Sequence, residues 1–450
     1  MEVITVALKE EDIIKEEPVT LVSPTNPNPT QRVYLSNIDQ TVAFPVETIF
    51  FFESLESSTN DVIEKVRRTI SEKFLIPYYF MAGRLGYNEE NKRLELVCNN
   101  GGVLFVGATS WLKLSNLGDV SLPNPSFHHL ILRIDGSLSL NDTPLFTIQV
   151  TRFSCGGYSI GFVTNHSIMD GRAAAEMFLT LGSICKSSTQ AIPLHLQTKH
   201  STLTLNLDRY SYIKPRSPPL ITFHHDSEYT ISSPSSFTNL PLNLSLSPTH
   251  TCKVFSFTTS MINSLKLKAL TTCSSFEAMV AHLWRTRTKT VFDNPLATSS
   301  VLFAVDIRTK LNPPLPPNFI GNAVITTAAT AKVMDIEDKP FSFCVDKVKA
   351  AIERVNDEYV RSVIDWLEVH RGGVPSTMNE NFYVSAWWKL PFHELDFGHG
   401  KLVHGGPVVS GMDEFVLLLS NGNGKEGGVN VWMSLEKMKM EKFLCFVYDF

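Results

Sequence analysis

The chain has 450 residues and a formal net charge of −5, with 43% hydrophobic and 10% aromatic residues. This length exceeds what one hydrophobic core usually serves, so we expect two domains of about 200 residues each. The small net charge gives no electrostatic reason to expect nucleic acid or an anionic membrane as a partner, and no run of about 18 apolar residues predicts a membrane span.

Two features of the sequence bear on its compartment. The acidic segment 1–18 has no signal-peptide pattern, which predicts a soluble, cytoplasmic protein. The seven cysteines are odd in number, scattered, and never in CxxC spacing. They therefore indicate free thiols rather than a disulfide framework or a zinc site.

The first part of the chain carries helical and strand patterns in turn. A helix is predicted from Asn60 to Leu75, where apolar residues recur at helical spacing. Strands are predicted at Arg93–Cys98 and Val103–Val106, on either side of a turn sequence. Phe146–Val150 and Tyr158–Thr164 alternate around a CGG segment, which predicts a hairpin or a sheet crossover.

A second helical pattern starts after Gly171 and is followed by a stretch without periodicity, from about Lys186 to His250, rich in Ser, Pro, Thr and Asn. A connection this long is uncommon inside one domain, so we interpret it as a crossover between domains. Beyond it, Ser274–Glu277 fits a capping box. Further strands are predicted at Val301–Val305, Phe382–Ala386, Phe415–Leu419 and Val429–Met433.

These elements predict an α/β fold with two similar-sized domains of mixed β-sheet flanked by helices. The predicted domain limits are 1–186 and 251–450, with 187–250 as the crossover linker. No internal repeat is visible in the sequence.

Two short motifs suggest other chemistries. The GYSIG sequence at 157–161 matches the GxSxG motif of serine hydrolases, but that motif needs a sharp strand-to-helix turn, and Ser159 lies inside an alternating run. The glycine-rich sequence at 422–428 lies between two strand patterns and lacks the GK[ST] ending of a phosphate loop, so a hairpin turn is predicted there.

The NHSIMDG sequence at 165–171 lies where a strand pattern ends and a helical pattern begins. His166 falls on the same strand face as Tyr158 and Ile160, at the carboxyl end where open α/β sheets commonly place their sites. Gly171 would leave room for a ligand to approach. His166 and Asp170 supply only two metal ligands with no partner motif nearby, so no metal site is predicted.

HSIMDG resembles the HxxxDG motif of the BAHD acyl-CoA-dependent acyltransferases of plants, and DFGHG at 396–400 is similar to the second signature of that family. The resemblance extends in the right order over essentially the whole chain. Its other parts are LSNIDQ at 35–40, YYFMAGRL at 78–85, FAVDIRTK at 303–310, GNAV at 321–324 and SAWWKLPF at 385–392.

The resemblance implies a solvent channel between the two domains, with acyl-CoA entering from one face and an alcohol or amine acceptor from the other. It implies that His166 is the general base and that no acyl-enzyme forms. Ser385 matches a hydroxyl residue that donates to the oxyanion, and Trp387 would line the channel. Asp170 would pair with Arg308 and fix the loop that presents His166.

In the DFGHG variant, Asp396 is a second candidate for a catalytic residue, and a purely structural role is the alternative. His399 stands where relatives usually carry tryptophan, so it is a candidate for binding substrate, as a donor to a phosphate of CoA. The resemblance implies no cofactor, with acyl-CoA as co-substrate, and a monomer.

Two functional hypotheses follow from the resemblance. The first is an O-acyltransferase that moves an acyl group, with hydroxycinnamoyl as the class nearest in the family, from CoA to an alcohol. The second is a catalytically impaired transferase-like protein that acts as a partner or regulatory subunit in lipid or hormone metabolism.

Overall fold

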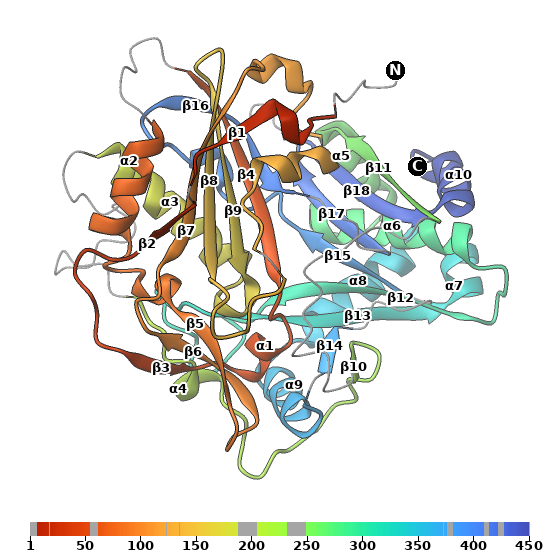
Figure 1. The fold of residues 1–450 in the computed structure, drawn as a ribbon. Coiled ribbons are helices and arrows are strands. Elements are labelled where there is room, and N and C mark those ends of the chain that lie inside the picture. Colours follow the sequence, from red (N-terminus) through yellow and green to blue (C-terminus); the bar gives the residue numbers. More distant parts are fainter. Residues whose placement is uncertain are drawn as a thin grey trace.

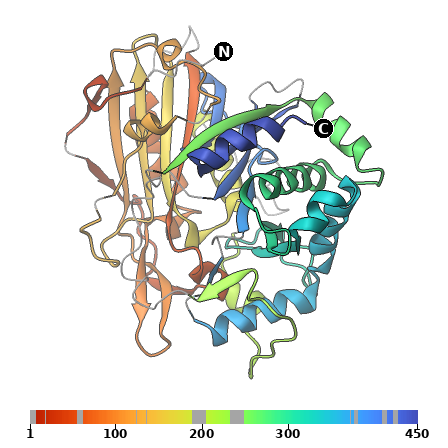
Figure 2. The same ribbon diagram turned by 90° about the vertical axis from the view of Figure 1, so that its right-hand side faces the viewer.

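The computed structural model describes residues 7–17, 19–54, 62–122, 124–134, 136–187, 205–231, 249–371, 373–375, 381–408, 414–421 and 427–449. Two mixed β-sheets organise the molecule (Figure 1). Figure 2 shows the N-terminal half, red to yellow, beside the C-terminal half, green to blue. The α/β class with two mixed sheets and flanking helices is thereby confirmed.

The first sheet has the strand order β1-β7-β8-β9-β4-β16, and β2 also pairs with β7. It is mixed because β7 and β8 run parallel whereas the other pairs are antiparallel. Its strands are β1 (Ile13–Lys15), β2 (Thr20–Val22), β4 (Pro45–Ser54), β7 (Val103–Ser110), β8 (Phe146–Phe153), β9 (Tyr158–Asn165) and β16 (Gly400–Pro407).

Both faces of this sheet are covered, so its central strands are buried along almost their whole length. On one face, α2 (Val62–Thr69) and α3 (Gly171–Lys186) pack their apolar residues onto the sheet. The ring of Phe178 from α3 stacks on Phe162 of β9 at 4.6 Å. The apolar residues of the 3₁₀ segment Pro125–Leu130 help to fill the other face.

The second sheet has the order β11-β18-β17-β15-β12-β13. Its strands are β11 (His250–Phe257), β12 (Thr298–Asp306), β13 (Val324–Lys332), β15 (Asn381–Ala386), β17 (Phe415–Ser420) and β18 (Val429–Glu436). Its helices are α5 (Thr259–Lys268), α6 (Ser275–Val291), α7 (Val333–Asp338), α8 (Phe341–Arg354), α9 (Asp357–Val369) and α10 (Lys437–Phe446). The predicted capping box opens α6, because Ser274 and Glu277 each accept a hydrogen bond from the other's backbone N–H.

Smaller elements connect the two halves. A three-stranded sheet has the order β3-β6-β5, and β10 pairs with β14. These elements are β3 (Gln31–Tyr34), β5 (Arg84–Asn88), β6 (Arg93–Cys98), β10 (Tyr229–Ile231), β14 (Gly373–Pro375), α1 (Asn37–Gln40) and α4 (Arg209–Ile213). Single helical turns lie at Glu10–Asp12, Ile70–Phe74, Tyr79–Ala82, Leu114–Leu117, His166–Ile168 and Phe392–Glu394.

Most predicted elements occur where the patterns placed them. The strand predicted at Arg93–Cys98 has the same bounds in β6, and β8 and β9 form a hairpin, one of the two arrangements predicted for them. Ser159 lies buried in the interior of β9, which excludes the nucleophile elbow. The glycine-rich sequence at 422–428 lies mostly outside the described residues, and the strands before and after it pair antiparallel.

The two halves exchange segments. β16 comes from the C-terminal half but pairs antiparallel with β4 of the first sheet. The described part of the crossover, 205–231, contacts both halves, because the ring of Tyr210 in α4 lies against Tyr34 of β3 whereas β10 pairs with β14. Residues 400–407 thus belong to the first sheet, although they follow the predicted linker 187–250. Within the described residues, no helix is both long and apolar enough to cross a membrane.

Candidate active site

His166 lies on a short loop, residues 166–170, between the end of β9 and the start of α3. We call this segment the histidine loop. Polar caps set both ends of this loop. The side chain of Asn165 accepts hydrogen bonds from Ser167 N at 3.1 Å and from Ser167 Oγ at 2.7 Å, and Asp170 caps α3 by accepting from Ala173 N at 3.0 Å. The strand-to-helix joint predicted from the sequence is confirmed.

The His166 ring is largely buried beside Phe44, at 5.4 Å between ring centroids, although the residue keeps some solvent-accessible surface. Burial lowers the pKa of the imidazole, and this outweighs the opposite effects of its own backbone, the Asp170 carboxylate and the Asn322 amide. A lowered pKa keeps the ring neutral near pH 7, and the neutral ring is the form that can accept a proton.

The Asp170 carboxylate is bound on both oxygens by groups other than the imidazole. Oδ1 accepts from Arg308 Nη2 at 3.0 Å as well as from Ala173 N. Oδ2 accepts from Ala323 N at 2.9 Å and lies 2.9 Å from Arg308 Nη1. The structure thus contains the expected ion pair of Asp170 and Arg308, and it ties the start of α3 to the C-terminal half.

Ser385 and Trp387 lie at the end of β15, where Trp387 Nε1 donates a hydrogen bond to Ser385 Oγ at 3.1 Å. The segment that follows packs against the histidine loop. A Cβ on Gly171 would lie 3.5 Å from Leu390, an ordinary contact, so packing does not require glycine at 171. The structure therefore brings the SAWWKLPF segment to the start of α3.

Asp396 lies at the opposite end of α3. Its carboxylate pairs with Lys186 Nζ at 2.6 Å and accepts from Gly398 N at 2.7 Å. Partial burial acts to raise its pKa, but the bonds from Lys186 and Gly398 and the charge of Lys186 prevail and lower it. Because α3 rises about 1.5 Å per residue, its two ends are about 20 Å apart. Asp396 therefore cannot act on the same atoms as His166, and its contacts do not support a catalytic role.

His399 is only 5% exposed, next to the start of β16. The neighbouring glycines allow a close approach of chains: Gly398 has a φ of +78°, and a Cβ on Gly400 would lie 2.1 Å from the backbone oxygen of Glu53. So enclosed a position leaves a phosphate little access to the imidazole. DFGHG has the geometry of an anchor for β16.

The chain matches the Transferase family model over residues 14–447. It belongs to this family, the BAHD acyltransferases.

The relatives of this BAHD chain transfer acyl groups, so it too is an acyl-transferring enzyme. Acyltransferase GLAUCE of Arabidopsis thaliana is 34% identical, covering 96% of this chain and 94% of the relative. Omega-hydroxypalmitate O-feruloyl transferase of the same plant is 32% identical over 96% and 92%. Shikimate O-hydroxycinnamoyltransferase of Nicotiana tabacum is 30% identical over 96% and 98%.

Solved structures share the fold of this BAHD chain. Vinorine synthase aligns with a TM-score of 0.73 at 21% identity, over 96% of this chain and 98% of that one. F. graminearum TRI101 complexed with coenzyme A and deoxynivalenol aligns with a TM-score of 0.71 at 15% identity, over 92% and 96%. The two-domain architecture is therefore that of the family.

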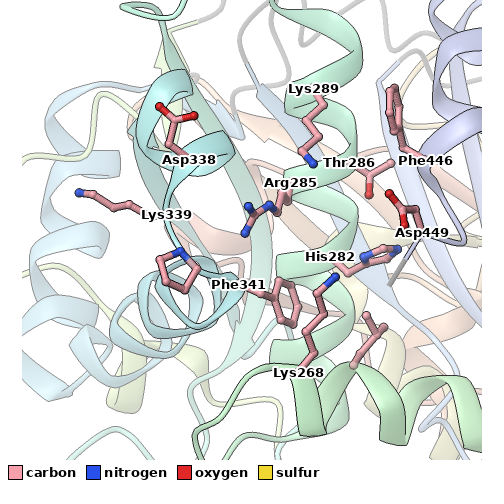
Figure 3. Close-up of a pocket in the computed structure, with 12 residues that line it drawn as sticks. Lys268, His282, Arg285, Thr286, Lys289, Asp338, Lys339, Phe341, Phe446 and Asp449 are labelled. Atoms are coloured by element: carbon pink, nitrogen blue, oxygen red, sulfur yellow. The ribbon is translucent and has the colours of Figure 1, made fainter.

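A separate cavity of about 370 Å³ lies in the C-terminal half (Figure 3). It is lined from α5, α6, the α7–α8 connection and the C-terminal segment, and includes Lys268, Arg285 and Lys289. None of the predicted site residues lines it, so it is distinct from the histidine loop. Over the described residues, no group of three or more His, Cys, Asp or Glu is placed to hold a metal ion.

Three polar residues beside the histidine loop were not predicted as site residues. Asn322 donates to the backbone oxygen of His166, and it is bound in turn by Asp39, which also pairs with Arg209. Asp39 and Asn322 lie within the family-like sequences LSNIDQ and GNAV, which could have pointed to them. Arg209 lies in the segment without periodicity, and nothing in the sequence marks it.

Proposed function

We propose that the chain transfers an acyl group of the hydroxycinnamoyl class from CoA to the hydroxyl of an aliphatic alcohol or ω-hydroxy acid. The observation that carries this proposal is the His166 imidazole, held with a lowered pKa on a loop that the Asp170 and Arg308 ion pair fixes. The acyl and acceptor classes are supported by the relatives whose names specify an O-feruloyl transferase acting on omega-hydroxypalmitate and a fatty alcohol:caffeoyl-CoA acyltransferase.

In this mechanism His166 takes the proton of the acceptor hydroxyl as its oxygen attacks the thioester carbonyl. An aliphatic alcohol holds its proton too tightly to react unaided at neutral pH, whereas a neutral imidazole can accept it. When the tetrahedral intermediate collapses, the carbon–sulfur bond breaks and the imidazolium returns the proton to the CoA sulfur. An amine acceptor would use the same steps.

The oxyanion of that intermediate needs a donor, and we assign this role to Ser385. Its oxygen already accepts the Trp387 indole N–H, and a hydroxyl that accepts one bond still has its own proton to donate. A positioned donor of this kind contributes about 10²- to 10³-fold to turnover. Trp387, beside it, would border the channel that the resemblance implies, and Gly171 would admit the substrate.

Asp170 and Arg308 act in this proposal through geometry, since neither oxygen of Asp170 bonds the imidazole. Asp396 and His399 are proposed to anchor β16 rather than to take part in the chemistry.

The alternative function is that of a transferase-like partner protein without turnover. It predicts that loss of His166 has no effect on CoA release.

The test is release of free CoA from feruloyl-CoA and caffeoyl-CoA with long-chain alcohols, ω-hydroxypalmitate and amines. We expect His166→Ala to lower turnover at least about 10²-fold, whereas His393→Ala, at a side chain 78% exposed, serves as the matched control and keeps it. Asp396→Asn should stay near the wild-type rate. Equal rates in wild type and His166→Ala, or no release with any pair, would support the alternative.

Cytoplasmic location and a monomeric state belong to the same proposal. Light scattering during size-exclusion chromatography tests the oligomeric state, and a fluorescent fusion in plant cells tests the location.

A further inference from the structure

A second carboxylate besides Asp170, that of Asp39, organises the histidine loop. Asp39 is fully buried in α1. Its Oδ1 accepts from Asn322 N at 2.9 Å and from Asn322 Nδ2 at 2.8 Å. Its Oδ2 accepts from Ser36 N and Ser36 Oγ at 2.8 Å each and lies 2.9 Å from Arg209 Nε.

Asn322 and Arg209, which both contact Asp39, also donate hydrogen bonds to the backbone of the histidine loop. Asn322 Nδ2 also donates to the carbonyl oxygen of His166 at 2.8 Å, so its amide bridges the carboxylate and the loop. Arg209 Nη2 donates to the carbonyl oxygen of Ile168 at 2.7 Å. Two of the three carbonyl groups in the turn 166–168 are therefore held by side chains that Asp39 orients.

The same short segment, 321–323, lies between the two carboxylates. Asn322 binds Asp39, while Ala323 N donates to Asp170 Oδ2 at 2.9 Å and the carbonyl oxygen of Gly321 accepts from Asp170 N at 3.3 Å. Asp39 thus acts on residues 166 and 168 of the histidine loop through Asn322 and Arg209, and Asp170 acts at residue 170. The loop is therefore held at several positions along its length.

Stability alone does not account for this arrangement. Asp39, Arg209 and Asn322 are each 0% exposed, and a buried ion pair is weak evidence for stability because desolvation offsets most of its attraction. What the hydrogen bonds from Asn322 and Arg209 do provide is a restricted geometry of the backbone turn that they bind. Here that geometry is the backbone direction from which the His166 side chain projects.

We propose that Asp39 is a positioning residue, which acts through Asn322 and Arg209 on the backbone of 166–168 and so aims the His166 imidazole at the acceptor. The kinetic consequence rests on the proposed function, while the effect on the ring itself does not. A displacement of about 1 Å in a catalytic group can cost up to about 10²-fold in rate.

The first experiment compares Arg209→Lys with Arg287→Lys. Arg287 is also fully buried, and its guanidinium binds Glu414 and the Asn381 carbonyl rather than the histidine loop, so it controls for loss of a buried guanidinium. We expect Arg209→Lys to lower kcat per folded molecule about tenfold with KM for the CoA thioester changed less than twofold. Arg287→Lys should leave kcat unchanged. Equal kcat in the two variants would overturn the proposal.

The second experiment needs no turnover and uses Asn322→Ala. The ring ¹³C resonance of His166, identified by its absence in His166→Ala, is followed through a pH titration. The Asp170 and Asp39 carboxylates, each paired with an arginine, and the Asn322 side chain all act to raise the pKa of the ring. Loss of the Asn322 amide is therefore expected to move the resonance and to lower the ring pKa further.

The two experiments separate two kinds of failure. If no acyl pair is turned over but the His166 resonance responds to Asn322→Ala and not to Arg287→Lys, positioning stands and the proposed function fails. If the resonance and its titration are the same in Asn322→Ala and wild type, the positioning role is wrong, whatever the activity.

Discussion

The His166 ring is largely buried, and its pKa determines how kcat/KM depends on pH. The ordinary pKa of the group is 6.5, and burial lowers it. The protonated ring cannot accept a proton, so kcat/KM must fall as the pH drops through the lowered pKa. We expect kcat/KM to hold down to pH 6.5 and to fall only below it, measured from pH 4.5 to 8. An acid limb at or above pH 6.5 would contradict this.

The ion pair of Asp170 with Arg308 gives a prediction at the same scale. Their side chains are 2% and 10% exposed, so Asp170→Asn removes the nearer charge partner of a largely buried guanidinium and leaves only the Asp306 carboxylate, at 3.4 Å. Breaking such a pair typically costs about 3 to 5 kcal/mol. We expect the free energy of unfolding in urea to fall by about 3 kcal/mol, and turnover to fall with it.

Asp306 offers the matched control for this substitution. It also contacts Arg308, at 3.4 Å, but its side chain is 42% exposed. Asp306→Asn should change stability by less than about 1 kcal/mol. If Asp170→Asn behaves like Asp306→Asn in both measurements, the ion pair does not fix the loop.

Among the elements, β16 depends on a close approach that only glycine allows. A Cβ at Gly400 would lie 2.1 Å from the backbone oxygen of Glu53 in β4, so the two strands would have to move apart. Forced overpacking of this kind typically costs about 1 to 3 kcal/mol. We expect Gly400→Ala to lower the midpoint of thermal unfolding by several degrees.

Gly406→Ala in the same strand is the control, because its Cβ would meet only the His404 side chain, at 3.3 Å. It should unfold within about 1 °C of wild type in the same scan. Equal midpoints for the two variants would mean that β16 does not require the close contact at residue 400.

The elements that could be predicted from the sequence are those whose signal is local. The period-two pattern of 93–98 and the capping box at Ser274 each involve residues a few positions apart, and the structure confirms both. The pairing of β16 with β4 joins residues about 350 positions apart, and no local pattern encodes such a contact.

The crossover is predicted as a linker because it has no apolar periodicity, yet Arg209 within it is fully buried. Its contacts are polar, and a hydrophobic pattern cannot reveal them.

On the scale of the whole molecule, the histidine loop is a junction of three parts of the chain. Asp39 and Asp170 come from the N-terminal half, Arg308 and Asn322 from the C-terminal half, and Arg209 from the crossover. The sequence resemblance predicted His166 and the pair of Asp170 with Arg308. It could not predict how these charges meet around one backbone turn, because that requires the two halves to be docked. The site is therefore complete only in the assembled molecule.

The acid stability of the whole molecule should reflect two further histidines, His225 and His282, which are 0% and 5% exposed. Burial and the nearby charge of Arg354 lower the pKa of His225 to about 4. Burial also lowers the pKa of His282 to about 4, although the hydrogen bond from its ring to the Val447 carbonyl acts to raise it. Below pH 6.5 the unfolded chain binds protons that the folded chain does not, so stability falls as the pH drops from 6.5 towards 4. Each histidine contributes up to about 1.4 kcal/mol per pH unit to this slope.

The measurement is urea unfolding of wild type and His282→Gln between pH 7.5 and 4.5, with His393→Gln as the exposed control. A glutamine amide can still donate to the Val447 carbonyl but takes up no proton in the unfolded chain, so His282→Gln should lose stability less steeply below pH 6.5. His393→Gln should follow the wild-type slope. If all three proteins share one slope, burial of His282 does not exclude its proton, and the acid sensitivity arises from other groups, His225 and the carboxylates among them.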